Sequence, residues 1–306
     1  MLQFVVRRLF GALIVAFGIV SVVFALIHLT PGDPVEVMLG ESATAADREQ
    51  LRTALGLNEP LGRQYGHYLA RVARFDLGQS LHVRRPIADL LRERLPATLT
   101  LAAAGVAVSL LLALPIGIGA ALRRGTWFDR GALAFATTAV SMPGFWLGPL
   151  LILVFSLWLG WLPVSGRDEP LAWVLPAVTL GLALAATLSR IVRAALLDVL
   201  AEDYLRTARA KGLRGRAVIL RHALANAALP VLTVVGLQLG ALLGGAVITE
   251  TVFQWPGLGL LTVEAIQRRD YPTLQACVLV ISLAYVLVNT VTDLLYGLVD
   301  PRLRLT

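Results

Sequence analysis

The sequence predicts an all-α integral membrane protein with six transmembrane helices. Of the 306 residues, 57% are hydrophobic, and the mean hydropathy of +0.74 exceeds that of ordinary soluble domains. Backbone groups in lipid must be hydrogen-bonded within the spanning segment, and a helix needs roughly 20 apolar residues to cross the bilayer core. Six stretches without Asp, Glu, Lys or Arg are long enough: 9–32, 95–122, 131–166, 170–189, 222–249 and 271–292.

The charges predict that both ends of the chain lie in the cytoplasm. In this orientation the inner segments carry 15 basic and 6 acidic residues, whereas the outer segments carry 12 basic and 14 acidic ones. Lys and Arg accumulate in the cytoplasmic loops of membrane proteins. The formal net charge of +7 therefore follows from membrane topology, and nucleic acid is not expected as a partner.

Residues 1–29 are expected to be the first transmembrane helix and to stay in the mature protein. Arg7 and Arg8 precede an apolar run of about 20 residues, which is longer than the hydrophobic part of a usual signal peptide. A cleaved signal peptide is the alternative. A turn at Pro31-Gly-Asp-Pro34 then ends this first span.

Residues 30–95 are expected to form a helical insertion on the extracytoplasmic side. Thr44 and Asp47 have the spacing of a capping box, and Gly56 stands where a helix would stop, so a helix is expected over 45–55. A second helix is expected over 60–74. A third, with its apolar residues on one face, is expected to lie along the membrane surface; these residues are Ile87, Leu90, Leu91 and Leu95.

Two features within the apolar stretches affect how the helices pack. Ser141-Met-Pro143-Gly144 should break or kink the third span, because proline lacks a backbone donor. The break is either structural or shapes a gate. Glycines recur four apart in the fifth span, where they allow close helix packing inside the subunit or against a partner or pathway; they are Gly236, Gly240 and Gly244.

A translocation pathway would need polar groups inside the spans. Ser141 and Met142, at the break, and Gln238, in the fifth span, are the candidates, because helix irregularity is tolerated where it lines a cavity. Serine can instead bond within its own helix, which is the commoner arrangement. An amide such as that of Gln238 is costly to leave unpaired in lipid.

The chain carries no obvious source of energy for transport. Ion-coupled carriers place ionisable residues in their spans, and these six stretches have none. A phosphate-binding loop Gly-x-x-x-x-Gly-Lys-Ser/Thr is also missing, and Lys211 is the only lysine. We expect no catalytic residue and no metal site, because no set of side chains has the spacing for either. Energy would have to come from another protein.

The charged block 202–212 is the predicted contact with that protein. Glu202 and Asp203 suit a helix N-terminus, and Gly212 suits a helix stop, which predicts a helix over 203–211. A helix should resume over 215–225. The residues expected to contact an ATPase are Glu202, Asp203, Tyr204, Thr207, Ala208, Lys211 and Gly212. Binding to lipid head groups alone is the alternative.

This block resembles the coupling loop of ABC importer permeases in the dipeptide/oligopeptide branch. The resemblance rests on Tyr204-Leu-Arg-Thr-Ala-Arg-Ala-Lys-Gly-Leu213 and on Arg221-His-Ala-Leu-Ala-Asn226. The broader pattern Glu-Ala-Ala-x-x-x-Gly fits only at Ala208 and Gly212, a departure that this branch shares. Further matching motifs span almost the whole chain, among them Asp76-Leu-Gly78, Arg94-Leu-Pro96, Glu250-Thr-Val-Phe-Gln-Trp-Pro-Gly-Leu-Gly259 and Arg269-Asp-Tyr-Pro272.

The resemblance implies a permease subunit of an ATP-driven importer in the cytoplasmic membrane of a prokaryote. Its core would be 96–306, with the coupling loop at about 194–228. The implied partners are a second homologous permease, two ATP-binding subunits that hold ATP and Mg²⁺, and an extracytoplasmic substrate-binding protein; no cofactor is expected on this chain. Short peptides are the implied cargo, with glutathione or nickel as alternatives. A non-pumping channel or scaffold is the alternative from another class.

Overall fold

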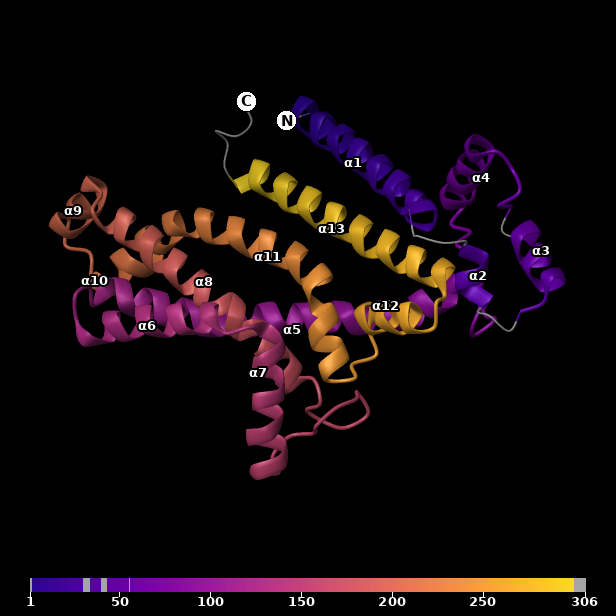
Figure 1. Ribbon diagram of the computed structural model, residues 1–306. Helices are drawn as coiled ribbons and strands as arrows, with labels where there is room; N and C mark the ends of the chain where they lie inside the picture. The colour runs from indigo at the N-terminus through magenta and orange to yellow at the C-terminus, as the bar shows by residue number, and fades with distance from the viewer. Residues whose placement is uncertain (1, 30–33, 40–42, 55, 300–306) are drawn as a thin grey trace.

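The computed structural model describes residues 2–29, 34–39, 43–54 and 56–299, and every regular element in these ranges is a helix (Figure 1). The α-helices are α1 Leu2–Leu29, α2 Pro34–Leu39, α3 Ala45–Ala54, α4 Leu61–Ala73, α5 Ile87–Leu122, α6 Trp127–Ser141, α7 Gly144–Leu151, α8 Val174–Leu200, α9 Asp203–Ala210, α10 Gly215–Ala217, α11 Leu224–Val252, α12 Leu258–Gln267 and α13 Tyr271–Val299. Two wider π-helical segments, η1 Ile152–Trp158 and η2 Val218–Ala223, continue α7 and α10.

The predicted all-α membrane fold is confirmed. Five segments are long and apolar enough to span a bilayer, and a bent pair of helices makes a sixth if it is counted as one span. The five are Val5–Leu26, Ile87–Leu122, Val174–Leu200, Gly215–Leu242 and Tyr271–Leu294, and the bent pair is Trp127–Ser141 with Gly144–Trp158.

The third span is broken where the sequence predicts it. Met142 has an extended backbone, with ψ of 123°, and Pro143 follows it. The residue before a proline is sterically pushed out of the helical region, so α6 must end there. The chain then turns by 103°, and α7 with η1 projects sideways from the other spans (Figure 1).

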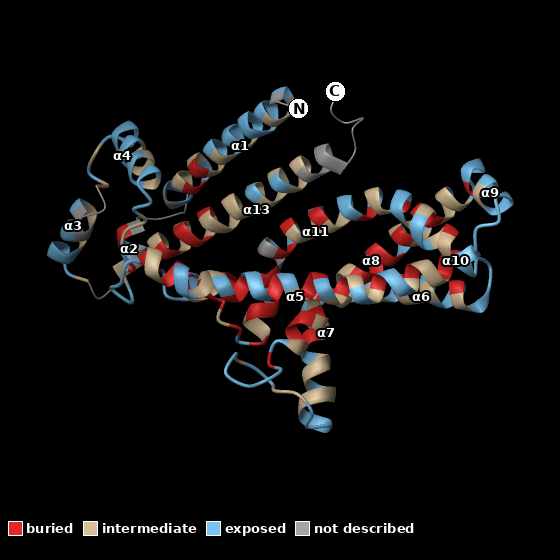
Figure 2. Cartoon of the chain, turned by 180° about the vertical axis from the view of Figure 1, so that it is seen from behind, coloured by how far each residue is buried: buried red, intermediate tan, exposed pale blue. Residues whose placement is uncertain are grey.

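The centre of the bundle is the close pair α5 and α8 (Figure 2). Gly117 of α5 and Gly181 of α8 each face the other helix with no room for a Cβ atom. In lipid, such close backbone approach supplies much of the helix association. On the far side of the bundle α13 packs between α11 and α1, and Val23 and Leu279 are buried where it meets α1.

The insertion after α1 has the predicted local structure. The backbone N–H of Asp47 donates to Thr44 Oγ1 (3.2 Å) and that of Thr44 donates to Asp47 Oδ2 (3.0 Å), so the capping box is confirmed. The hydrogen bonds from Thr44 lower the pKa of Asp47. Gly56, at φ 69°, follows the helix, and α4 matches the helix expected over 60–74. The predicted turn lies mostly outside the described residues, because 30–33 are not among them.

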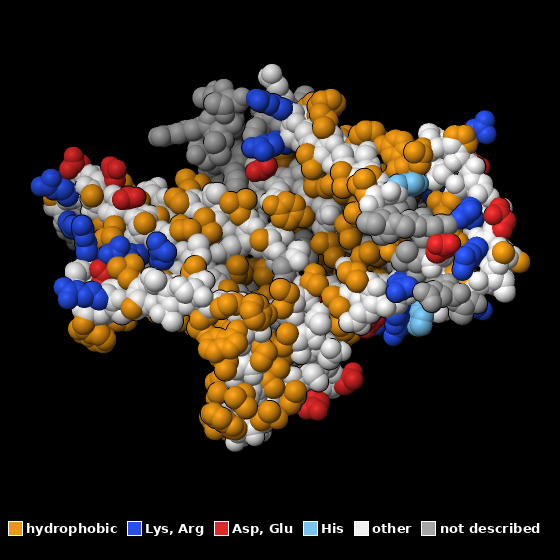
Figure 3. Space-filling model, viewed as in Figure 1, with side chains coloured by type: hydrophobic (Ala, Val, Ile, Leu, Met, Phe, Trp, Pro, Cys, Tyr) orange, Lys and Arg blue, Asp and Glu red, His pale blue; other side chains and the backbone are white. Residues whose placement is uncertain are grey.

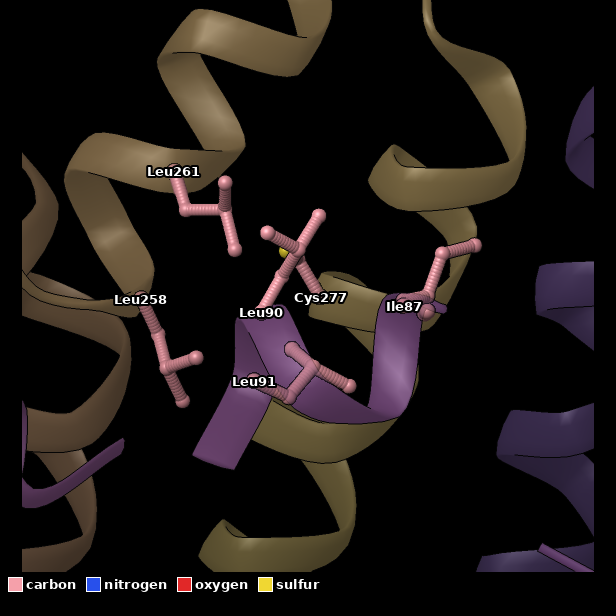
Figure 4. Close-up of a cluster of buried hydrophobic side chains, with 7 residues drawn as sticks. Ile87, Leu90, Leu91, Leu258, Leu261 and Cys277 are labelled. Atoms are coloured by element: carbon pink, nitrogen blue, oxygen red, sulfur yellow. The ribbon is translucent and has the colours of Figure 1, made fainter. Parts of the chain in front are cut away.

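The helix predicted over 87–95 is present, but its predicted position along the membrane surface is wrong. These residues are the first turns of α5, which passes through Pro96 without ending. Ile87, Leu90 and Leu91 are buried against α12 and α13, where Cys277 is also buried as expected (Figure 4). The apolar face has a protein partner, so it is not left for the lipid surface.

The helix α8 extends beyond the apolar stretch 170–189 that predicts it. It continues to Leu200 and includes the charged residues Arg190, Arg193 and Asp198. The first part of the expected loop 194–228 is therefore helical. Arg193 is paired with Asp129 of α6, and Arg190 and Asp198 are exposed, so none of these charges is buried without a partner.

Candidate functional site

The helix α9 lies at the end of the molecule remote from α3 and α4 (Figure 1). It begins after Glu202, which has an extended backbone with ψ of 140°, and it is followed by Gly212 at φ 80°. Only glycine adopts this left-handed conformation without steric cost, so the glycine ends the helix and turns the chain toward α10. The predicted helix, its stop and the renewed helix from Gly215 are all confirmed.

One side chain fixes α9 to the ends of the spans. Leu205 is fully buried in a hydrophobic cluster to which α5, α8, η2 and α11 all contribute. The other buried members of this cluster are Ala121, Ala195, Leu196, Val218, Ala223 and Ala227. The cluster packs α9 directly against these four segments. Because packed side chains transmit displacement, α9 must move with the segments when they tilt.

A polar contact makes a second attachment. Asn226 Nδ2, near the start of α11, donates to Tyr204 Oη (2.7 Å) and to the His222 carbonyl oxygen (3.1 Å). Tyr204 is one of the predicted site residues, whereas Asn226 stands in the sequence only as the last residue of a matching motif. Its position in that motif was the signal that could have identified it.

The other face of α9 is open to solvent. Glu202, Asp203, Thr207 and Lys211 are exposed, as is Gly212, and Ala208 is half-buried. Asp203 pairs with Arg206 at 3.3 Å, but both side chains are more than three quarters exposed. An ion pair so exposed contributes little to stability. These charges are therefore available to a partner.

An ion pair supports the base of this end of the molecule. Asp129 Oδ1 accepts from Arg193 Nε (2.6 Å), and Asp129 Oδ2 accepts from Arg193 Nη2 (2.9 Å) and from the backbone N–H of Gly125 (2.9 Å). Asp129 is buried, and such bidentate pairing compensates the loss of water around it. The pair joins the α5–α6 turn to α8, and sequence reasoning missed it because no motif links residues 64 apart.

The structure does not gather the three pathway candidates into one polar cluster. Ser141 is exposed at the end of α6, where its hydroxyl donates to the Thr137 carbonyl oxygen (2.9 Å), and Met142 is half-buried beside it. Gln238 lies on α11 against α8, and its Nε2 donates to the Leu184 carbonyl oxygen (3.2 Å). In this conformation Gln238 is a helix-interface residue.

The glycines of the fifth span pack mainly inside the subunit. A Cβ on Gly236 would collide with Thr292 of α13, and one on Gly240 would press on Tyr285 and Asn289. A Cβ on Gly244 would meet no described atom within 4 Å, so this position is open. Two of the three predicted packing positions thus hold α11 against α13.

At the opposite end of the spans, two buried carboxylates organise the motifs found in the sequence. Glu250 accepts hydrogen bonds from the Thr98 hydroxyl (2.7 Å) and from two backbone N–H groups in the first turn of α12, those of Gly259 (2.7 Å) and Leu260 (3.1 Å). Asp270 accepts from the hydroxyls of Ser80 and Thr273. Both carboxylates are fully partnered, so their role is to join α5, α11, α12 and α13.

Comparison with known families matches almost the whole chain. Residues 113–305 match the family described as binding-protein-dependent transport system inner membrane component, and residues 1–102 match the model for the N-terminal part of such components. Together the two models leave only ten residues between them unmatched, 103–112.

Individual relatives and solved structures agree with this match. The glutathione transport system permease protein GsiC of Escherichia coli K12 is 44% identical over 304 residues, covering 99% of both chains. The protein of the same name from Pectobacterium atrosepticum is 43% identical over the same share. Two inward-facing structures of the MetNI methionine ABC transporter give TM-scores of 0.59 and 0.60 at 19% identity, over 70% of this chain and 98% of theirs. At that identity the likeness shows the fold alone.

Proposed function

The chain belongs to the family of binding-protein-dependent transport system inner membrane components, and on this premise we propose that it conducts short peptides, glutathione among them. It is a permease subunit of an ABC importer and a multi-pass protein of the cytoplasmic membrane. The proposed cargo is supported by relatives at 44% identity whose name specifies glutathione transport. Nickel and a non-pumping channel are the alternatives that an uptake experiment distinguishes.

The observation that carries the proposal is the attachment of α9. A short helix with one exposed polar face and one side chain fixed among the ends of three spans can transmit force from a protein bound outside the membrane. When two ATP-binding subunits close on ATP and Mg²⁺, α9 would move with them and tilt α8 and α11 between inward-facing and outward-facing states. In this proposal ATP hydrolysis belongs to those subunits, and this chain binds no cofactor.

The remaining partners complete the assembly. A second homologous permease would form the other wall of the pathway, and a substrate-binding protein would deliver the peptide to the side on which α3 and α4 lie. A peptide has charged termini, so its route must be wide and hydrated. Ser141, Met142 and Gln238 are the proposed pathway residues, and Gln238 would have to exchange its bond to the Leu184 carbonyl for water when the helices tilt.

The test is uptake of radiolabelled glutathione and dipeptides by cells that express the complete transporter. Gly212→Pro should abolish uptake without affecting membrane insertion, because proline cannot adopt the φ of 80° that turns the chain after α9. Gly215→Pro is the matched control, since Gly215 is the first residue of α10, where proline is tolerated.

Two outcomes would contradict the proposal. Normal uptake by Gly212→Pro would remove α9 from the mechanism. Uptake of neither glutathione nor any dipeptide by the unmodified transporter, with accumulation of nickel instead, would overturn the proposed cargo, and equilibration without ATP would indicate a channel.

A further inference from the structure

A groove lies between α5 and α6 near the α9 end of the molecule. It has a volume of about 250 Å³, and its lining is almost entirely apolar. The lining residues are Ile116, Trp127, Phe128, Gly131, Ala132 and Phe135. Nothing in the described chain fills the space at Gly131, where a Cβ would have no atom within 4 Å. The groove therefore remains open because Gly131, which lines it, has no side chain.

The surface around the groove is suited to lipid. Leu111, Leu122 and Leu133 on the same two helices are exposed, as expected for helix faces that contact acyl chains. Trp127, at the end of α6, is 83% exposed. An exposed tryptophan at the end of a spanning helix is typical of the membrane–water interface. The groove thus begins at the level of the head groups and runs along the apolar part of the helices.

Positive charge stands at the mouth of the groove. Arg123, Arg124 and Arg130 all belong to the α5–α6 turn or the first turn of α6. The guanidinium of Arg123 lies 5.3 Å from the centre of the Phe128 ring, which lines the groove, and this places a cation beside its opening. Basic side chains also collect at this end of the molecule in the space-filling view (Figure 3).

The one carboxylate in this turn does not neutralise these arginines. Asp129 is engaged by Arg193 of α8 through two hydrogen bonds, and it is buried. Its charge is therefore already compensated from another helix. The turn presents a net positive surface directly above an apolar groove.

We propose that the α5–α6 hairpin is a binding site for an anionic phospholipid of the cytoplasmic leaflet. One acyl chain would occupy the groove at Gly131, and the phosphate would lie against Arg123 and its neighbouring arginines. This rests on the orientation assigned to the permease under its proposed function. Because the site joins the α5–α6 turn to α8 through Asp129 and Arg193, the lipid would hold the spans beneath α9 in register.

The experiment uses the complete transporter in nanodiscs that contain equal amounts of phosphatidylglycerol and phosphatidylcholine. Photoactivatable analogues of each lipid, with the reactive group on the acyl chain, are crosslinked and mapped by peptide mass spectrometry. The phosphatidylglycerol probe should label residues 116–135 in preference to the phosphatidylcholine probe. Arg123→Gln should lower this preference about fivefold, the contribution of one arginine near an anionic head group.

Substitutions at the groove separate acyl-chain binding from general contact with the bilayer. Gly131→Leu should suppress labelling by both probes, and Gly131→Ala should do so in part, since a Cβ at this position meets no other atom and would occupy the groove itself. Gly18→Leu in α1 is the matched control, because Gly18 is equally open to its surroundings. Arg63→Gln, in α4 at the other end of the molecule, is the control for charge.

Labelling is measured without transport, so it does not depend on which cargo the transporter accepts. Equal labelling of 116–135 by the two probes, or undiminished labelling of Gly131→Leu, would overturn the proposal. A photoreactive side chain at position 131 gives an independent check. If it crosslinks the second permease or an ATP-binding subunit in place of lipid, the groove is a protein interface and the proposal is wrong.

Discussion

The two ends of the spans are held together in different ways. At the α9 end, one buried leucine and one tyrosine–asparagine hydrogen bond attach a helix whose outer face is exposed, and one ion pair joins the α5–α6 turn to α8. At the opposite end, two buried carboxylates are fully hydrogen-bonded and join four helices. The first arrangement lets a small element move as a unit with the spans, whereas the second fixes the helices relative to one another.

The largest loss of stability is expected from the buried carboxylate network. Glu250→Ala leaves three buried donors without an acceptor: the Thr98 O–H and the backbone N–H groups of Gly259 and Leu260. Orphaned buried donors cost about 1–3 kcal/mol each, so the free energy of unfolding should fall by about 4 kcal/mol. Denaturant unfolding of the purified permease measures this. Glu264→Gln is the control, since the pair of Glu264 with Arg94 at 3.9 Å is partly exposed and weak.

At the α9 end, the corresponding substitution in the hydrophobic core should weaken the coupling of ATP hydrolysis to uptake more than it lowers the amount of permease in the membrane. Leu205→Ala removes the side chain that fixes α9 and should cost about 3 kcal/mol, confined to α9 and its neighbours. We expect ATP hydrolysis by the partner subunits to continue while uptake of peptide is lost. Leu213→Ala, at a position 43% exposed in the same loop, should leave both unchanged. Loss of the whole protein from the membrane would show that this end is as rigid as the other.

The ion pair should show an intermediate effect. Asp129→Asn removes the charge that Arg193 and the Gly125 N–H bind, and a hydrogen bond to a charged group is worth about 2 kcal/mol. Lower thermal stability and weaker coupling of ATP hydrolysis to uptake are expected together. Asp198→Asn, an exposed residue near the end of the same α8, is the control. An unchanged melting temperature in Asp129→Asn would mean that the pair does not hold the turn to α8.

The smallest expected effect is on the polar attachment of α9. Tyr204→Phe keeps the ring but removes the acceptor of the Asn226 amide, which should cost about 1 kcal/mol. Asn226→Ala should cost about as much. The double variant should lose less than the sum of the two single ones, because the Tyr204–Asn226 bond is lost only once; the bond of Asn226 to the His222 carbonyl oxygen is lost in addition. Additive losses in uptake would indicate that they act separately.

Short-range sequence patterns predicted much of the structure at both ends of the spans. The lengths of the apolar stretches predicted the spans, the Thr44–Asp47 spacing predicted α3, and Gly212 predicted the end of α9. Each of these depends on neighbours within a few residues or on bilayer thickness. The proline at 143 predicted a break for the same reason, but not the 103° bend, which depends on packing that involves α7, α8 and α11.

What was not predicted depends on contacts between distant residues. An amphipathic face over 87–95 indicates burial but not the partner, and the partner is α12 with α13 in place of lipid. Likewise, Arg193 inside α8 looks like the start of a loop until Asp129 is placed beside it. The bond of Asn226 to Tyr204 is of the same kind. Tertiary pairing therefore decided the elements that sequence reasoning got wrong or missed.

The central claim is that α9, and not the opposite end, binds the ATP-binding subunits. A cysteine at Thr207, on the exposed face of α9, can be tested by crosslinking in the complete transporter, since the native Cys277 is buried. A cysteine at Arg63 in α4 is the control at the other end. We expect a crosslink from position 207 to an ATP-binding subunit and none from position 63. No crosslink from 207 in any nucleotide state, or one from 63 instead, would contradict the account.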